Sequence, residues 1–258
     1  IRTLQIDEIK SNQKTLTQAQ QRTIENISKS SQKKFLIHGV TGSGKTEIYL
    51  HLAKNAIEKN QQAIILVPEI SLTPQLIDYF SNTFKGQLAV LHSKLSLGER
   101  EREWWRIQTG AAKVVIGSRS AIFAPAKNIG LIIMDEEHEW SYKQDKTPYY
   151  HARDIAFKIS ELTGAKVVMG SATPSIEMSH AAETGLVERF MLNKRINKSE
   201  SLPPVHLADM RQELQKKNYS IFSDLLDQKI KSTLEAKEQI ILFLNRRGHA
   251  SAVLCRDC

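Results

Sequence analysis

The chain has 258 residues, of which 41% are hydrophobic, so it can bury a sizeable core and is not mostly disordered. Its apolar runs are far shorter than the roughly 18 residues that a transmembrane helix needs, and we expect no membrane partner. The 36 Lys and Arg residues exceed the 28 Asp and Glu residues and give a net charge of +8, which favours a polyanionic partner. Only two cysteines are present, which excludes a disulfide-rich secreted domain and favours the cytoplasm.

Short apolar and β-branched runs recur along the chain and predict the strands of one sheet. Most of them lack the alternation of a half-exposed strand, which is typical of strands buried in a parallel sheet between helical crossovers. The predicted fold class is therefore α/β, with a mostly parallel sheet flanked by helices. The expected strands are Phe35–Ile37, Ala63–Val67, Leu88–Leu91, Lys113–Ile116, Ile129–Met134, Lys166–Met169 and Glu238–Leu244.

Capping residues and apolar spacing predict several helices. Thr73-Pro74 and Thr173-Pro174 each place a capping hydroxyl before a proline, so a helix is expected to start at both points. Further helices are expected over Thr46–Lys59 and Phe222–Ala236. The segment Asn197–Pro204 has no apolar period and is the predicted linker. The residues after it contain too few strands for a sheet of their own.

A phosphate-binding loop is predicted by Gly39-Val40-Thr41-Gly42-Ser43-Gly44-Lys45-Thr46, which matches G-x-x-x-x-G-K-[ST]. The glycines let backbone N–H groups converge on phosphate oxygens, and the Lys45 ammonium neutralises the outer phosphates. The Thr46 hydroxyl is suited to ligate Mg²⁺. The motif therefore predicts a site for a nucleotide such as ATP with Mg²⁺, and the alternative is a glycine-rich turn without a ligand.

A second motif, Leu131-Ile-Ile-Met-Asp135-Glu136-Glu137-His138, is an apolar strand that ends in carboxylates. Because parallel strands deliver their ends to one edge, Asp135 is expected to meet the Mg²⁺ held by Thr46. Glu136 is expected to orient or deprotonate the attacking water. With Lys45 these residues form the predicted catalytic set, which favours hydrolysis of the γ-phosphate. A solvated acidic turn is the alternative.

With both motifs in place, the chain from about residue 16 onward resembles superfamily 2 DNA helicases, and more closely the replication-restart helicases among them. The matching stretches are Leu66–Gln75 (motif Ia), Gly117–Ala121 (Ib), Asp135–His138 (II), Gly170–Ser175 (III) and Leu242–Gly248 (IV). Stretches that are more specific to the replication-restart helicases are Leu91–Arg100, Tyr142–Gln144, Tyr150–Asp154, and Asn245–Gly248 running into Cys-x-x-Cys.

The resemblance implies ATP-dependent 3′ to 5′ DNA unwinding in replication restart and primosome assembly at stalled forks. Its implied partners are forked and single-stranded DNA, primosome and helicase-loading proteins, and single-stranded-DNA-binding protein. Residues 16–200 would be the first RecA-like ATPase lobe, residues 1–15 a linker from a missing upstream domain, and residues 201–258 the truncated start of the second lobe.

Motifs V and VI of this family, which include its arginine finger, lie beyond Cys258. We therefore expect weak hydrolysis by the 258 residues alone. Two other functions stay open: a double-stranded DNA translocase of the restriction or repair type, and a nucleotide-gated DNA-binding module with little hydrolysis.

Gln20 and Arg119 each allow two interpretations. Gln20 occupies the place of the glutamine that reads adenine in related helicases, and with Thr17 it also forms the Thr-x-x-Gln pattern of a capping box. Both roles are compatible. Arg119 is either a contact to a DNA phosphate or an ordinary residue of a solvated loop.

His138, Ser171 and Thr173 are weaker candidates for coupling. The resemblance implies that His138 couples the ATP site to DNA, whereas an ordinary strand-end histidine fits the sequence equally well. Ser171 and Thr173 are candidates for a relay between lobes. Helix capping explains Thr173 from the sequence alone.

The segment from residue 139 to residue 153 interleaves four aromatic side chains with three basic ones. Such a composition suits single-stranded DNA, because rings stack on bases while cations hold phosphates. A strand bound here is expected to move Glu136 and His138 into their working geometry. The alternative is a folded loop whose aromatic side chains pack on the sheet edge. The candidate DNA contacts are Trp140, Tyr142, Lys143 and Arg153.

Cys255 and Cys258 have the two-residue gap that is usual in tetrahedral zinc sites, but they supply only half of one. In the helicases that the chain resembles, such a pair opens a cysteine-rich zinc insertion. We therefore expect Zn²⁺ in the intact protein and only a half site in these residues.

Overall fold

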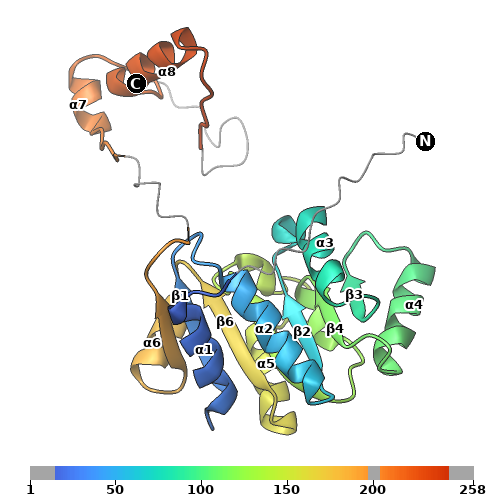
Figure 1. Cartoon of the computed structure of the whole chain (residues 1–258). Coiled ribbons are helices and arrows are strands. Elements are labelled where there is room, and N and C mark those ends of the chain that lie inside the picture. Colours follow the sequence, from blue (N-terminus) through green and yellow to red (C-terminus); the bar gives the residue numbers. More distant parts are fainter. Residues whose placement is uncertain (1–14, 197–203, 244–258) are drawn as a thin grey trace. The chain divides into compact units, whose positions relative to one another are not determined.

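The computed structural model describes residues 15–196 and 204–243, and the chain divides into two compact units, residues 1–200 and 201–258, which are described separately (Figure 1). In the larger unit, the strands form one parallel sheet of order β3-β4-β2-β5-β6-β1-β7, which confirms the predicted α/β class. The strands are β1 Lys34–Gly39, β2 Gln62–Leu66, β3 Leu88–Leu91, β4 Val114–Gly117, β5 Ile129–Asp135, β6 Lys166–Ser171 and β7 Glu188–Leu192.

Helices cover both faces of this sheet. The helices α1, α2 and α3 pack on one face in a core that includes Ile65, while α4, α5 and α6 pack on the other in a core that includes Ile64. Successive strand residues point to opposite faces, so the central strands are apolar throughout and show no alternation. The helices are α1 Gln18–Lys29, α2 Lys45–Glu58, α3 Pro74–Thr83, α4 Leu97–Gln108, α5 Ala152–Thr163 and α6 Ile176–Glu183. Short 3₁₀ turns are η1 Glu69–Ser71, η2 Arg119–Phe123 and η3 Trp140–Tyr142.

Two strand predictions need correction. β7 was not predicted, because this edge strand carries alternating exposed residues that include charged ones. The expected strand Glu238–Leu244 is wrong over its described part, because residues 238–243 form no β-strand. Ile241 in this stretch is 94% exposed. A strand gains its stability from its neighbours, and residues 204–243 contain no other strand for it to pair with.

One of the two predicted helix starts is also wrong. Thr73 caps α3 by accepting a hydrogen bond from the backbone N–H of Leu76, as expected. The helix expected at Thr173 instead begins at Ile176, with Ser175 as its cap. The backbone N–H of Thr173 donates to the Ser171 hydroxyl at 2.9 Å, so Thr173 belongs to the turn before the helix.

The smaller unit has α7 Met210–Gln215 and α8 Asp224–Glu235 in its described part, and α8 confirms the helix predicted there. Residues 1–14, 197–203 and 244–258 lie outside the described residues. The predicted linker, apart from Pro204, falls in these ranges, as do most of motif IV and both Cys255 and Cys258. Across the described ranges, no helix is both long and apolar enough to cross a bilayer.

Candidate active site

The phosphate-binding loop joins the end of β1 to the start of α2 and depends on its glycines. Gly42 and Gly44 both have φ of +79°, a conformation that residues with a side chain rarely adopt. Gly44 precedes the first turn of α2, and no side chain caps that helix end. The Ser43 hydroxyl is buried and has no hydrogen-bond partner among the described residues. The loop therefore offers free helix N–H groups and a free hydroxyl, which fit a phosphate group.

The other loop residues lie around this turn. Val40 and Thr41 are exposed, and Thr46 is half-buried in the first turn of α2. The backbone N–H of Val40 donates to the Leu192 carbonyl at 3.1 Å. The backbone N–H of Ile196 donates to the Gly42 carbonyl at 3.0 Å. The segment after β7 therefore lies directly against the loop, a contact that no sequence pattern announced.

Gln20 is buried beneath the loop and bridges it to α1. Its amide oxygen accepts from the backbone N–H of Thr17 at 2.8 Å and from the Thr17 hydroxyl at 3.0 Å, which completes the predicted capping box. Its amide nitrogen donates to the carbonyls of Ser43 at 3.0 Å and Gly44 at 3.3 Å. An amide has two donor and two acceptor positions, so all of them are used. In this conformation Gln20 therefore supports the loop and has no capacity left to read adenine.

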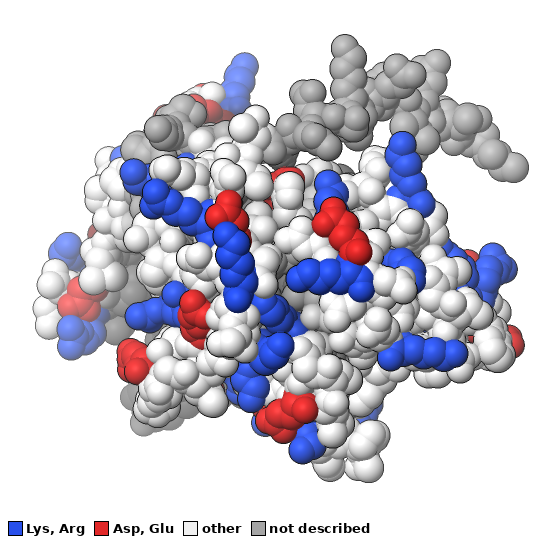
Figure 2. Space-filling model, turned by 60° about the horizontal axis from the view of Figure 1, so that its bottom comes forward, with Lys and Arg blue, Asp and Glu red and all other residues white. Residues whose placement is uncertain are grey.

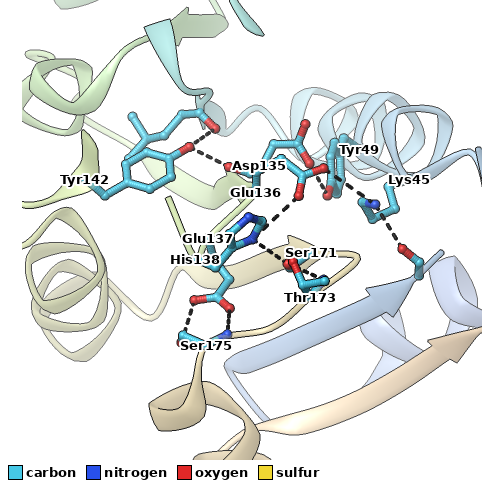
Figure 3. A network of polar contacts seen from close by, with 12 residues as sticks. Lys45, Tyr49, Asp135, Glu136, Glu137, His138, Tyr142, Ser171, Thr173 and Ser175 are labelled. Carbon is cyan, nitrogen blue, oxygen red and sulfur yellow. Dashed lines mark hydrogen bonds and ion pairs between the residues drawn. The ribbon is translucent and has the colours of Figure 1, made fainter. Parts of the chain in front are cut away.

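Lys45 links the loop to the second motif. Its ammonium donates to the Gly39 carbonyl at 3.0 Å and lies 3.7 Å from Glu136 Oε1 (Figure 3). The side chain is largely buried, so the charge interacts with its partners in a poorly solvated site. The structure thus brings together two residues of the predicted catalytic set that are 91 positions apart in the sequence.

Asp135 ends β5 opposite Gly170 of β6 and is held by Tyr49, a residue that sequence reasoning missed. The Tyr49 hydroxyl donates to Asp135 Oδ1 at 2.8 Å (Figure 3). A Cβ at Gly170 would clash with that hydroxyl, so the glycine makes room for it. Burial raises the pKa of the Asp135 carboxyl, as does the Glu136 charge, while the Tyr49 hydrogen bond and the charge of Lys45 lower it.

Glu136 has φ of +46°, which is uncommon for a residue with a side chain and typical of functional sites. Its carboxylate lies between Lys45 and the His138 ring, whose Nδ1 is 3.7 Å from Oε2. The same ring nitrogen lies 2.7 Å from the Ser171 hydroxyl. A chain of polar contacts therefore runs from the phosphate loop through motif II to motif III (Figure 3).

Glu137 is buried and anchors motif III, a role that no sequence pattern predicted. Its carboxylate accepts from the Ser175 backbone N–H at 2.7 Å and from the Ser175 hydroxyl at 3.0 Å. This pairing explains why α6 is capped by Ser175 and not by Thr173. Arg153 lies 3.9 Å from the same carboxylate and is mostly buried. Its guanidinium is thus directed at Glu137, and the placement does not support the predicted contact to DNA.

Tyr142 is fully buried, so the prediction that it presents its ring to DNA bases is wrong. Its single O–H is shared between the carbonyls of Leu66 at 3.0 Å and Asp135 at 2.6 Å, which ties the loop to the ends of β2 and β5. In contrast, Trp140 is 83% exposed and Lys143 is also exposed. These two residues remain available to a ligand.

Arg119 holds the same loop from the side of motif Ib. Its guanidinium donates to the carbonyls of Ser141 at 2.9 Å and of Lys143, and to the Gln144 side chain. It also lies over the Tyr150 ring at 5.8 Å. The predicted contact to a phosphate is therefore replaced, in this conformation, by support of the loop.

A phosphate-binding loop after β1, two carboxylates at the end of β5, one strand away across β6, and a parallel sheet between helices define the class of P-loop nucleoside triphosphatases. Within that class, the chain belongs to the DEAD/DEAH box helicases, whose family model matches residues 17–181. Membership implies the use of ATP and Mg²⁺. The glycine conformations, the unpartnered Ser43 hydroxyl and the Asp135 carboxylate fit these groups.

Curated relatives are similar over most of the chain. The replication restart protein PriA of Bacillus subtilis (strain 168) is 50% identical over 234 residues, which are 91% of this chain and 29% of the relative. PriA of Synechocystis sp. (strain ATCC 27184 / PCC 6803 / Kazusa) is 47% identical over 228 residues, or 86% of this chain and 27% of the relative. The chain thus spans less than a third of these relatives.

Solved helicase structures share the fold. RecG bound to a three-way DNA junction matches with a TM-score of 0.55 and 23% identity over 75% of this chain and 26% of that one. The DUF1998 helicase MrfA matches with a TM-score of 0.56 and 16% identity over 92% of this chain and 37% of that one. The larger unit therefore has the RecA-like fold of helicase domains.

Proposed function

We propose that this chain is the first ATPase lobe, with the start of the second, of an ATP-dependent 3′ to 5′ DNA helicase that acts in replication restart and primosome assembly. One observation carries the proposal: the contacts Lys45–Glu136–His138–Ser171 connect the phosphate loop to motifs II and III on a helicase fold. The identity to proteins named replication restart protein PriA supports it. The proposed substrates are forked and single-stranded DNA, with single-stranded-DNA-binding protein and helicase-loading proteins as partners in the cytoplasm.

Each site residue has a proposed task. Lys45 neutralises the outer phosphates, Thr46 and Asp135 hold Mg²⁺, and Glu136 accepts the proton of the attacking water. Bound Mg²⁺ supplies charge stabilisation at the phosphates. Tyr49 fixes the Asp135 carboxylate through its hydrogen bond at 2.8 Å. In the intact protein, Cys255 and Cys258 contribute to a zinc site.

Coupling to DNA is proposed to pass through His138 and Ser171. Their contact is short, at 2.7 Å, and His138 also faces Glu136. The loop that carries Trp140 follows His138 directly and is tied by Tyr142 to the carbonyl of Asp135. A strand that moves this loop therefore acts on the backbone that positions both carboxylates.

The proposed function is tested by ATP hydrolysis and strand separation with the full-length protein. Single-stranded and forked DNA are expected to stimulate hydrolysis, and forks with a 3′ single-stranded tail are expected to be unwound. A protein that blunt duplex stimulates equally and that separates no strands would be a double-stranded DNA translocase. A protein that binds nucleotide and DNA without DNA-stimulated hydrolysis would be a binding module.

Trp140→Ala is expected to weaken single-stranded DNA stimulation while leaving stability unchanged. The side chain is 83% exposed, and a stacked base contributes about 1–3 kcal/mol, which corresponds to roughly 5- to 150-fold in the DNA concentration needed for half-maximal ATPase. Trp105→Ala, which removes an exposed tryptophan of α4, is the matched control and is expected to change neither quantity.

Tyr142→Ala is expected to lower the stability of the protein, in contrast to Trp140→Ala. Loss of a buried ring costs about 3–5 kcal/mol, which lowers Tm by roughly 6–20 °C in a unit of this size. Thermal unfolding and DNA titrations of the ATPase measure both effects. If Trp140→Ala lowered Tm and kept normal stimulation, the loop would be structural and the stacking role would be wrong.

A further inference from the structure

The edge of the sheet opposite the active site carries a row of lysines. In sheet order, the six adjacent strands from β3 to β1 each have a lysine at their first residue or within the three residues before it. Only β7, at the end of the row, begins with Glu188. Figure 2 shows the bottom of the unit, where blue side chains outnumber red ones. We call this row the amino edge, and its lysines are Lys33, Lys34, Lys59, Lys85, Lys113, Lys127 and Lys166.

Most lysines of the amino edge have no carboxylate partner. Lys34 pairs with Glu161 at 3.4 Å, and Lys113 donates to the Asn60 side chain at 3.1 Å. The other exposed lysines of the row, Lys33, Lys59, Lys85 and Lys127, form no ion pair with the described residues. Because charges of one sign repel each other, a row in which most exposed lysines have no ion-pair partner among the described residues indicates a surface that an anionic partner stabilises.

A cavity in the amino edge concentrates this charge. It has a volume of about 350 Å³ and is lined by Lys33, Lys59 and Lys166 together with Ser28, Asn55 and Gln61, and no carboxylate is among its lining residues. The Lys166 ammonium donates to the carbonyls of Ile27, of Ser28 at 2.9 Å and of the C-cap residue Ser30 at 3.1 Å. These contacts use its three N–H groups, so Lys166 adds positive charge to the cavity without a free donor. Burial lowers the pKa of Lys166, the charges of Lys33 and Lys59 lower it further, and the charge of Glu188 partly offsets these effects.

We propose that the amino edge binds the phosphate backbone of duplex DNA, with one phosphate in the cavity lined by Lys33, Lys59 and Lys166. This inference rests on the proposed function, because that function supplies DNA as the polyanion. It adds a second DNA contact on the side of the lobe opposite the loop that carries Trp140. A small anion would occupy the cavity alone, whereas the lysines continue along the whole edge.

The length of the row favours a duplex. Neighbouring strands lie about 4.8 Å apart, so six strands place the outer lysines roughly 24 Å apart. Duplex DNA rises about 3.4 Å per base pair and carries phosphates on both strands, so this distance corresponds to roughly seven base pairs. A row of cations held on a rigid sheet edge matches a rigid duplex better than a flexible single strand.

The test compares two triple variants of the full-length protein that change the net charge equally. Lys59→Gln with Lys85→Gln and Lys127→Gln removes three unpaired lysines of the amino edge and spares Lys166, which caps α1. Lys216→Gln with Lys229→Gln and Lys237→Gln in the smaller unit is the matched control. Duplex and single-stranded DNA binding are measured by fluorescence anisotropy at salt concentrations from about 50 to about 300 mM. The dependence of the binding constant on salt reports how many phosphate contacts are made.

The amino-edge variant is expected to bind duplex roughly tenfold or more weakly, and the slope of log K against log salt is expected to fall by about 2.7, or 0.9 per lost phosphate contact. Its nucleotide binding and single-stranded DNA stimulation are expected to stay normal. Equal losses in both variants would show an effect of net charge alone and overturn the proposal. Unchanged duplex binding together with lost binding of an acidic polyglutamate peptide would assign the edge to a protein partner. Absence of any DNA response in the unmodified protein would contradict the proposed function instead.

Discussion

Lys45→Ala is expected to abolish ATP hydrolysis by the full-length protein. The Lys45 ammonium lies at the junction of the phosphate loop and Glu136, 3.0 Å from the Gly39 carbonyl and 3.7 Å from the carboxylate. Removing a group that stabilises charge in the transition state costs about 10²- to 10³-fold in rate. Steady-state phosphate release measures the effect.

A matched control for this variant is Lys54→Ala, which removes another lysine of α2 near the opposite end of the helix. It is expected to keep full turnover, and both variants are expected to keep the wild-type Tm within about 1–2 °C. A Lys45→Ala protein that retained full hydrolysis would show that nucleotide is bound and hydrolysed elsewhere.

Glu136→Gln and Asp135→Asn are expected to separate chemistry from metal binding. Glu136→Gln keeps the size of the side chain and removes the carboxylate proposed to accept the proton, so turnover should fall by about 10²- to 10⁴-fold. Nucleotide affinity in the presence of Mg²⁺ should remain within about threefold, because Glu136 is not the proposed metal ligand.

Asp135→Asn is expected to weaken Mg²⁺-dependent nucleotide binding in addition to turnover. An amide oxygen is a poorer ligand than a carboxylate for a hard cation, and the amide can still accept the hydrogen bond from Tyr49. Titration of a fluorescent ATP analogue with and without Mg²⁺ distinguishes the variants. If both lost the same affinity in both conditions, the division of roles between Asp135 and Glu136 would be wrong.

The main features of the larger unit follow from local sequence. Six strands and the α/β class were predictable because residues such as Ile64 and Ile65 are buried on opposite faces of the sheet, which leaves a continuous apolar run. The edge strand β7 was not predictable in this way. Its Arg189 and Met191 face solvent, so its sequence does not differ from that of a loop.

The candidate site likewise contains residues that the sequence predicts and residues that it does not. The phosphate loop and motif II were recognised because each is a contiguous pattern whose residue types are fixed by phosphate and Mg²⁺ chemistry. Tyr49 gave no such signal. Its partner Asp135 is 86 positions away, and only the register of β5 with β6, which places Gly170 beside that hydroxyl, leaves room for the contact.

The segment from residue 139 to residue 153 shows that composition does not decide which aromatic side chains are buried. In the sequence, Trp140 and Tyr142 are both aromatic residues close to basic ones, and nothing distinguishes their roles. The tertiary structure buries Tyr142, because its hydroxyl satisfies the carbonyls of Leu66 and Asp135, and it leaves Trp140 in solvent. The sequence by itself determined the fold class, the phosphate-binding loop and the carboxylates proposed as catalytic, since each depends on a contiguous run of residues. Which side chains support that site and which remain exposed to a ligand was decided only by the tertiary structure, because burial and hydrogen bonding depend on residues that are distant in the chain.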